Sequence, residues 1–246
     1  MIMTIAQREL RSLFLSPVAW SVLAVHQFIL GWIFLRVVER FTGLEAAKRV
    51  AGISLELTLN VFSFAALLSL FSIPLLAMRL FSEEQRSGTY RLLRSAPVSL
   101  GEILLGKYLG LSVLLLTVSL LPLLMGLSLT IGTDPDLGLI ASAFVGLMML
   151  NLCFAAVAIF ASTLTSQPAA AAVAGYGILL LLSVVSQTRD LAENDYVGFF
   201  QWLSWNEHLL PFLLGMVRTS DLVYFLGTTA LFLLLALRQL ENRDLG

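Results

Sequence analysis

Long apolar runs separated by short charged segments dominate this chain of 246 residues. A membrane-spanning helix needs about 20 consecutive apolar residues to cross a hydrocarbon core of roughly 30 Å. Runs of about that length predict six spans, and a segment rich in Ser and Thr that ends at Pro168 divides the longest run into two of them. The expected spans cover residues 17–35, 57–78, 103–131, 137–162, 168–187 and 222–237.

Two further segments have helical patterns without the composition of a span. In residues 1–16 the apolar side chains share one helical face, opposite polar and charged residues, which predicts a helix lying in the membrane interface. Residues 197–217 are mostly apolar but contain Glu207 at their centre, where a charge at mid-bilayer would cost several kcal/mol. We therefore expect an external re-entrant helical pair there, with Trp202 and Trp205 at the interface.

The most charged interruption follows the second expected span. Its pattern predicts an amphipathic helix over residues 82–95, with an N-cap, acidic residues in the first turn and basic residues near the C-terminal end, as the helix dipole favours. A proline ends this helix. The residues concerned are Ser82 as the N-cap, Glu83, Glu84, Arg91, Arg94 and Pro97.

Composition makes this an integral membrane protein. Hydrophobic residues make up 58% of the chain and charged residues 13%, against about 25% charged in soluble domains. We expect an all-α polytopic protein with a single domain over residues 1–246, because the segments outside the spans are too short for an ATPase or another independent core. The net charge of -1 argues against a nucleic-acid partner.

The distribution of basic residues predicts the orientation. With the N-terminus inside, the inner segments carry nine Lys and Arg residues and the outer segments six. The positive-inside rule therefore favours cytoplasmic termini and a cytoplasmic location for residues 82–95.

A phosphate-loop motif is almost present at residues 101–108, GEILLGKY. Tyr108 replaces the Ser or Thr that would hold magnesium, and Lys107 enters an apolar span, where we expect it to snorkel toward the interface. We therefore expect no nucleotide on this chain. Cys153 is the only cysteine, and the Met and His residues form no cluster, so we expect no metal site either.

Several polar or small residues within the apolar segments have two interpretations. His26, Gln27 and Asn151 are either helix-contact residues or polar points on a transport path. Ala171 and Gly175 form a small-xxx-small pair that favours close helix packing, with a partner helix in the same chain or in a second copy. Glu207 and His208 are either interfacial polar residues or part of an external gate.

The order of these parts resembles the permeases of ABC type-2 exporters. The resemblance rests on the N-terminal phrase RELRSLFLSP, on EEQRSGTYRLL beginning at Glu83, on APVS at residues 96–99 and on Gly106-Lys107 at the third span. It is closest to the compact six-span subgroup that includes the gliding-motility and nitrous-oxide-reductase-maturation permeases.

The resemblance implies a permease dimer, or a pair of related permeases, in the bacterial inner membrane with two cytoplasmic ABC ATPase subunits. ATP and Mg would be bound by the ATPase, and this chain would be a transport subunit with no catalytic residues. Membrane lipid and an auxiliary envelope subunit are further expected partners. The helix at residues 82–95 would be the coupling helix, contacting the ATPase through Glu83, Glu84, Arg86, Ser87, Gly88, Thr89, Arg91 and Arg94, with a second inner-leaflet contact at Arg8 and Arg11.

Two alternatives of other classes remain. The first is an intramembrane enzyme that uses His26, Asn151 or the Glu207-His208 pair, although no set of acid, base and nucleophile has a recognisable spacing. The second is a scaffold subunit of a membrane complex that transports nothing. The sequence does not identify a substrate.

Overall fold

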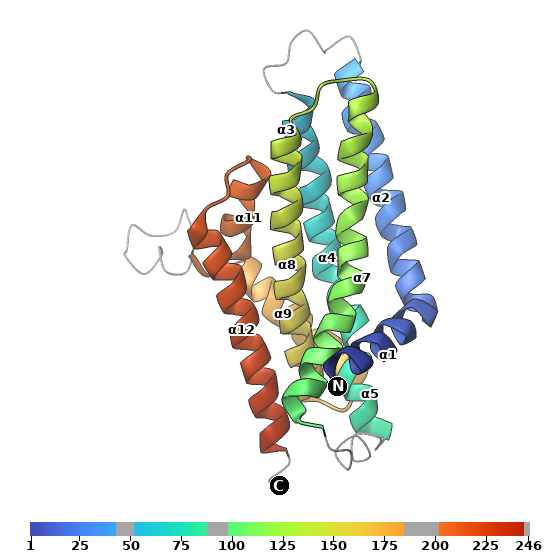
Figure 1. Ribbon diagram of the computed structural model, residues 1–246, viewed down its shortest axis with the longest axis vertical. Coiled ribbons are helices and arrows are strands. Elements are labelled where there is room, and N and C mark those ends of the chain that lie inside the picture. The colour runs from blue at the N-terminus through green and yellow to red at the C-terminus, as the bar shows by residue number, and fades with distance from the viewer. Residues whose placement is uncertain (43–51, 88–97, 185–201, 244–246) are drawn as a thin grey trace.

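A bundle of long, steep helices makes up the protein in the computed structural model, which describes residues 1–42, 52–87, 98–184 and 202–243 (Figure 1). These residues contain no strand, so the expected all-α class is confirmed. Among them, five helical stretches are long and apolar enough to cross a membrane. They are α2 (Pro17–Thr42), Ile53–Ser87, Leu100–Ile131, α8 (Leu137–Leu164) and α12 (Thr219–Asn242).

The remaining expected span corresponds to α9 (Pro168–Val184), which has 17 residues. It is apolar but shorter than the other five stretches, and the chain beyond it, residues 185–201, lies outside the described residues. The count of six spans therefore stays a prediction. The break between α8 and α9 falls at residues 165–167, within the expected Ser/Thr-rich segment.

The amphipathic helix α1 (Ile2–Leu15) meets α2 at an elbow. Ser16 has an extended backbone, with φ −78° and ψ 128°, and Pro17 begins α2, a position that tolerates proline because no N–H donor is needed there. The indole Nε1 of Trp20 donates to the carbonyl of Phe14 at 2.7 Å across the elbow. Ala6 and Leu13 form the buried face of α1.

Helix α2 continues past the expected end at residue 35. It runs to Thr42, and Arg36 bonds Glu39 at 3.3 Å one turn later on the helix surface. The helix is therefore about two turns longer than the expected span, which covered residues 17–35. The appearance of charge marks the end of the apolar surface, and the helix itself extends two turns further.

The second expected span and the charged helix after it form one nearly continuous helical stretch. It comprises α3 (Ile53–Leu57), the π-helical turn η2 (Thr58–Phe62), α4 (Ser63–Ala77) and α5 (Arg79–Ser87), with a turn only at Met78. The prediction that Ser82 is an N-cap is wrong. Ser82 is buried inside α5, and its hydroxyl donates to the carbonyl of Met78.

Each helix of the following hairpin begins at a side-chain cap. Ser99 and Glu102 form a capping box at the start of α7 (Leu100–Ser128), with Glu102 N to Ser99 Oγ at 3.3 Å and Ser99 N to Glu102 Oε2 at 3.1 Å. The short helix η3 (Leu129–Ile131) follows, and Asp136 caps α8. The capping box gives Ser99 and Glu102 a structural function at the start of α7.

Helix α8 lies at the centre of the bundle and contacts α4, α7, α9, α12 and the short helix α11 (Trp205–Leu213). A Cβ atom built on Gly146 would lie 2.5 Å from Cβ of Phe212, so α11 packs directly on the α8 backbone. Trp205 is buried edge-on against Phe154, with ring centroids 5.3 Å apart. Trp205 is therefore a core side chain, whereas Trp202 is 50% exposed, and the interface position expected for both stays a prediction.

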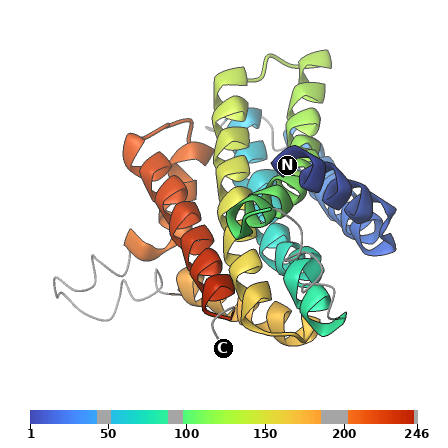
Figure 2. The same ribbon diagram turned by 60° about the horizontal axis from the view of Figure 1, so that its bottom comes forward.

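Helix α5, helix α1 and the C-terminal end of α12 lie toward the same end of the bundle (Figures 1 and 2). That arrangement follows from the hairpin geometry of the long helices. It agrees with the expectation that the charged segment and both termini share one side of the membrane. Which compartment that side faces stays a prediction.

Candidate functional site

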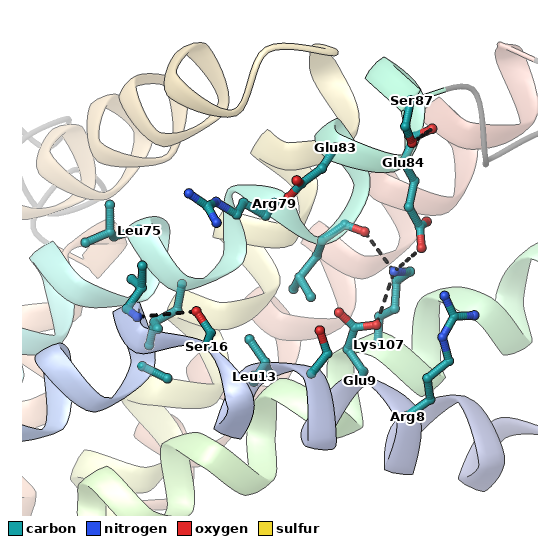
Figure 3. A pocket seen from close by; sticks show the side chains of 15 residues that line it. Arg8, Glu9, Leu13, Ser16, Leu75, Arg79, Glu83, Glu84, Ser87 and Lys107 are labelled. Atoms are coloured by element: carbon teal, nitrogen blue, oxygen red, sulfur yellow. Dashed lines mark hydrogen bonds and ion pairs between the residues drawn. The ribbon is translucent and has the colours of Figure 1, made fainter.

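Lys107 forms a three-way connection at the end of the bundle where α1 and the C-terminal end of α12 lie. Its side chain is only 3% exposed. The Nζ atom donates to the carbonyl of Leu80 at 2.8 Å, to Oε1 of Glu84 at 2.8 Å and to Oε2 of Glu9 at 3.4 Å (Figure 3). An ammonium group has three N–H donors, so each has an acceptor. A single side chain of α7 thereby joins α5 and α1.

Close packing of α1 on α7 buries this ammonium. A Cβ atom built on Gly106 would lie 2.7 Å from Cβ of Ile5, and one built on Gly110 would lie 3.0 Å from the carbonyl oxygen of Ala6. The absence of side chains at both glycines lets the α1 backbone rest on α7. The expectation that Lys107 snorkels is wrong, because α1 covers it. The signal in the sequence was the GxxxG spacing from Gly106 to Gly110.

The electrostatics of this site make it sensitive to change. Two carboxylates, on Glu9 and Glu84, share one ammonium, and Oε2 of Glu84 is buried without a hydrogen-bond partner. The ring of Phe81 lies 5.2 Å from Lys107 Nζ and adds a cation–π contact. Removing one partner of a buried ion pair costs about 3–5 kcal/mol, because the other charge is left uncompensated.

A second set of bonds attaches α5 to α8. Ser162 Oγ accepts from the backbone N–H groups of Phe81 and Ser82, at 3.1 and 3.2 Å, and donates to the carbonyl of Met78 at 3.1 Å. Gln85 Nε2 reaches the carbonyl of Thr163 at 3.5 Å. Helix α5 is therefore held on one side by α8 and on the other by α7 and α1.

The predicted coupling residues do not share one face of α5. Glu83, Arg86 and Ser87 are exposed, whereas the Glu84 side chain points inward to Lys107 and is 17% exposed (Figure 3). The direction of the Glu84 side chain thus differs from the outward one expected for a contact with the ATPase. Arg8 and Arg11 are exposed on α1. Gly88, Thr89, Arg91 and Arg94 lie outside the described residues.

The polar residues predicted within the membrane helices differ in their burial and in their hydrogen-bond partners. His26 is buried in α2, with Nδ1 3.0 Å from the carbonyl of Val22, and its Nε2 has no partner among the described residues. Gln27 is exposed. Asn151 of α8 donates to Ser119 Oγ of α7 at 2.8 Å, a buried contact between helices.

The small residues of α9 pack against the same chain. A Cβ atom built on Gly175 would lie 3.2 Å from Cβ of Pro74 in α4 and 3.6 Å from Cβ of Ala161 in α8. Ala171, one turn earlier, is also buried. Of the two partners left open by the sequence, the structure therefore gives this pair an intrachain one.

His208 connects α11 to α12. Its Nδ1 lies 2.7 Å from Oδ1 of Asp221, its Nε2 lies 2.8 Å from the carbonyl of Trp202, and its ring stacks on Tyr224 with centroids 3.9 Å apart. Both polar partners are acceptors, so both bonds form when each ring nitrogen carries a hydrogen. Sequence reasoning missed Asp221, because nothing in the spacing relates it to His208. Glu207 is only partly exposed.

The described part of the chain holds no group of three or more His, Cys, Asp or Glu side chains that could bind a metal ion. Cys153 is buried in the α8 core. The chemistry of the described side chains is therefore that of helix connection, through the Lys107 cluster, Ser162 and the His208–Asp221 pair.

Comparison with models of protein families identifies the family of this chain. The model of a family described as "ABC-2 family transporter protein" matches residues 3–245, nearly the whole chain. No curated protein matches the chain significantly.

Proposed function

This chain belongs to the ABC-2 transporter family, and from that premise we propose that it is an exporter permease whose α5 receives movement from a cytoplasmic ATPase. Membership makes it an integral membrane subunit of an ABC transporter and implies an ABC ATPase partner. The finer proposal is a permease dimer, or two related permeases, carrying two ATPase subunits in the bacterial inner membrane with both termini in the cytoplasm.

The exposed surface of α5 supports the docking part of the proposal. Arg86 lines a groove of about 940 Å³ between α5 and the turn that joins α8 to α9, where Gln167 and Pro168 form the opposite wall. This groove lies at the same end of the bundle as α1 and the C-terminal end of α12. A partner seated there would contact a helix whose other face is bonded into the membrane helices.

The Lys107 cluster is the observation that carries the transmission part. A push on α5 acts on the Leu80 carbonyl and on Glu84, and the ammonium of Lys107 transfers it to α7 and, through Glu9, to α1. Ser162 transfers the same displacement to α8. Displacement of packed helices as rigid bodies is a common form of conformational change.

ATP and Mg belong to the ATPase in this proposal, and the residues of this chain transmit movement only. The helical segment that includes α11 is proposed as the external gate, with His208 connecting it to α12. The family match does not extend to a subgroup. Work at the cell envelope, suggested by the resemblance to gliding-motility and nitrous-oxide-reductase-maturation permeases, and an auxiliary envelope subunit belong to the proposal alone.

Reversing the charge of Arg86 tests the docking surface. The tagged chain, carrying Arg86→Glu, is purified from native membranes after mild cross-linking, and the copurified ATPase is quantified. We expect a loss of most of the ATPase relative to wild type. Arg36→Gln, an exposed arginine at the far end of α2, is the matched control and retains it. Equal recovery from Arg86→Glu and wild type contradicts the assignment of α5.

A further inference from the structure

A cavity between α1 and the α4–α5 stretch adjoins an apolar groove along α2. The cavity measures about 410 Å³ and the groove about 480 Å³, and Val18 and Leu75 line both. Charged side chains surround the cavity (Figure 3), whereas the groove is lined mainly by apolar ones, among them Val22, Val25 and Phe71. A polar compartment thus adjoins an apolar one.

The position of the elbow between α1 and α2 places these compartments at different depths. Amphipathic α1 exposes both apolar Leu15 and charged Arg8, as expected of a helix at the membrane interface. Trp20, 58% exposed beside the elbow, is typical of the same level. The cavity therefore lies at the level of lipid head groups, and the groove beside α2 lies in the hydrocarbon region.

The cavity wall formed by α4 and α5 presents three kinds of side chain in order. Leu75, Arg79 and Glu83 follow one another four residues apart, and all three line the cavity. Each step advances about 6 Å along a helix. Arg79 forms no ion pair with any described residue, and neither does Arg8 on the facing wall. An apolar group, a cation and an anion therefore line the path from the groove into the cavity.

One hydrogen-bond acceptor of this cavity, on Glu84, has no donor. Lys107 uses all three N–H groups on Leu80, Glu84 and Glu9, yet Oε2 of Glu84 still has no partner. A buried carboxylate oxygen without a donor is costly. A ligand ammonium in the cavity would satisfy it and would balance the second carboxylate of the cluster.

We propose that cavity and groove together bind one membrane phospholipid whose head group is a phosphate followed by a primary ammonium. Its phosphate lies against Arg79, its ammonium lies against Glu83 and the free oxygen of Glu84, and an acyl chain lies in the groove from Leu75 toward Phe71. A trimethylated head group has no N–H to donate, and an uncharged glycerol head group has no cation. The site therefore selects phosphatidylethanolamine over phosphatidylcholine and phosphatidylglycerol.

Native mass spectrometry of the purified permease, without any ATPase, tests the proposal. The protein in detergent is titrated with the three phospholipids, all with the same acyl chains. We expect wild type to bind phosphatidylethanolamine about tenfold more tightly than the other two, the factor for one hydrogen bond to a charged group. Equal binding of all three, or binding to none, overturns the proposal.

Variants separate the parts of the site. Glu83→Gln removes one of the two ammonium partners and reduces the preference, Arg79→Gln weakens binding of all three lipids, and Ser21→Phe fills the groove and weakens binding of all three. Arg11→Gln, on α1 but not lining the cavity, is the control and binds as wild type. Retention of the full preference by Glu83→Gln contradicts the head-group assignment.

A soluble competitor distinguishes lipid from head group. Free phosphoethanolamine has the same charges without acyl chains, so we expect it to displace phosphatidylethanolamine only at concentrations at least about a hundredfold higher. Displacement at equal concentration shows a site for the head group alone and overturns the assignment of a lipid. Circular dichroism and gel filtration confirm that each variant is folded.

Discussion

The Nζ atom of Lys107 lies 2.8 Å from Oε1 of Glu84, a residue 23 positions earlier in the chain. This bond crosses from α7 to α5 and has a buried cation at one end and a nearly buried carboxylate at the other. In the proposed function it determines whether movement of α5 reaches the membrane helices. A structural test and a functional test of the bond can therefore be made with the same variant.

Lys107→Met keeps the unbranched chain up to Cε and removes the ammonium group with its charge. Two carboxylates are left without their cation, so we expect a loss of about 3–5 kcal/mol in the free energy of unfolding, and a lower melting temperature in detergent. In the complex we expect the ATPase to remain bound while its hydrolysis no longer responds to the permease. Arg36→Gln removes an exposed ion pair and changes stability by less than about 1 kcal/mol. Normal coupling in Lys107→Met would show that force passes elsewhere.

Substitutions at two glycines of α7 are predicted to change the stability of the protein in opposite directions. In Gly110→Ala the new Cβ would meet the Ala6 carbonyl at 3.0 Å and Cβ of Glu9 at 2.9 Å, so α1 must move away. We expect a cost of about 1–3 kcal/mol and faster proteolysis of α1. Gly101→Ala, in the first turn of the same helix, has nothing within 4 Å and removes only glycine's flexibility. It should therefore stabilise the protein by about 0.4–1 kcal/mol. Equal melting temperatures for the two variants would contradict this packing.

The sequence predicted local structure well at the N-terminus and at the α8–α9 turn. Periodicity and length are sufficient there, because the pattern of residues 1–16 and the hydroxyls before Pro168 act on their own neighbourhood. Helix ends inferred from charge were less reliable. Ser82 has the residue type of an N-cap, yet the helix passes through it, because a change from apolar to charged surface does not stop the backbone hydrogen-bonding pattern.

The tertiary partners of charged residues could not be predicted in this way. Glu84 lies in a charged segment, which is usually solvated, yet in the fold it points inward to Lys107 of α7. Asp221 lies in the first turn of α12, a position typical of an interfacial acid. In the fold, α11 places His208 beside it. Both cases need the relative positions of helices distant in sequence, which periodicity does not contain.

Ser162 gives a prediction about the second attachment of α5. Ser162→Ala removes the acceptor shared by the N–H groups of Phe81 and Ser82 and should cost about 1–3 kcal/mol. We expect faster hydrogen exchange in the peptide that covers α5, with unchanged exchange in α12. Thr117→Val removes a hydroxyl that bonds only within α7 and serves as the control. Unchanged protection of α5 in Ser162→Ala would show that this bond does not hold the helix.

The His208–Asp221 pair allows a prediction that distinguishes a structural connection from an exposed polar site. His208→Phe retains an aromatic ring to stack on Tyr224 but leaves the buried Asp221 carboxylate without its hydrogen-bond donor, so we expect a loss of about 1–3 kcal/mol. The double variant His208→Phe/Asp221→Leu removes the uncompensated charge and should be more stable than His208→Phe alone. Thermal unfolding of wild type, both single variants and the double variant gives the coupling energy. If the two losses simply add, the two side chains are not energetically coupled, and α11 is held to α12 by the aromatic contacts instead.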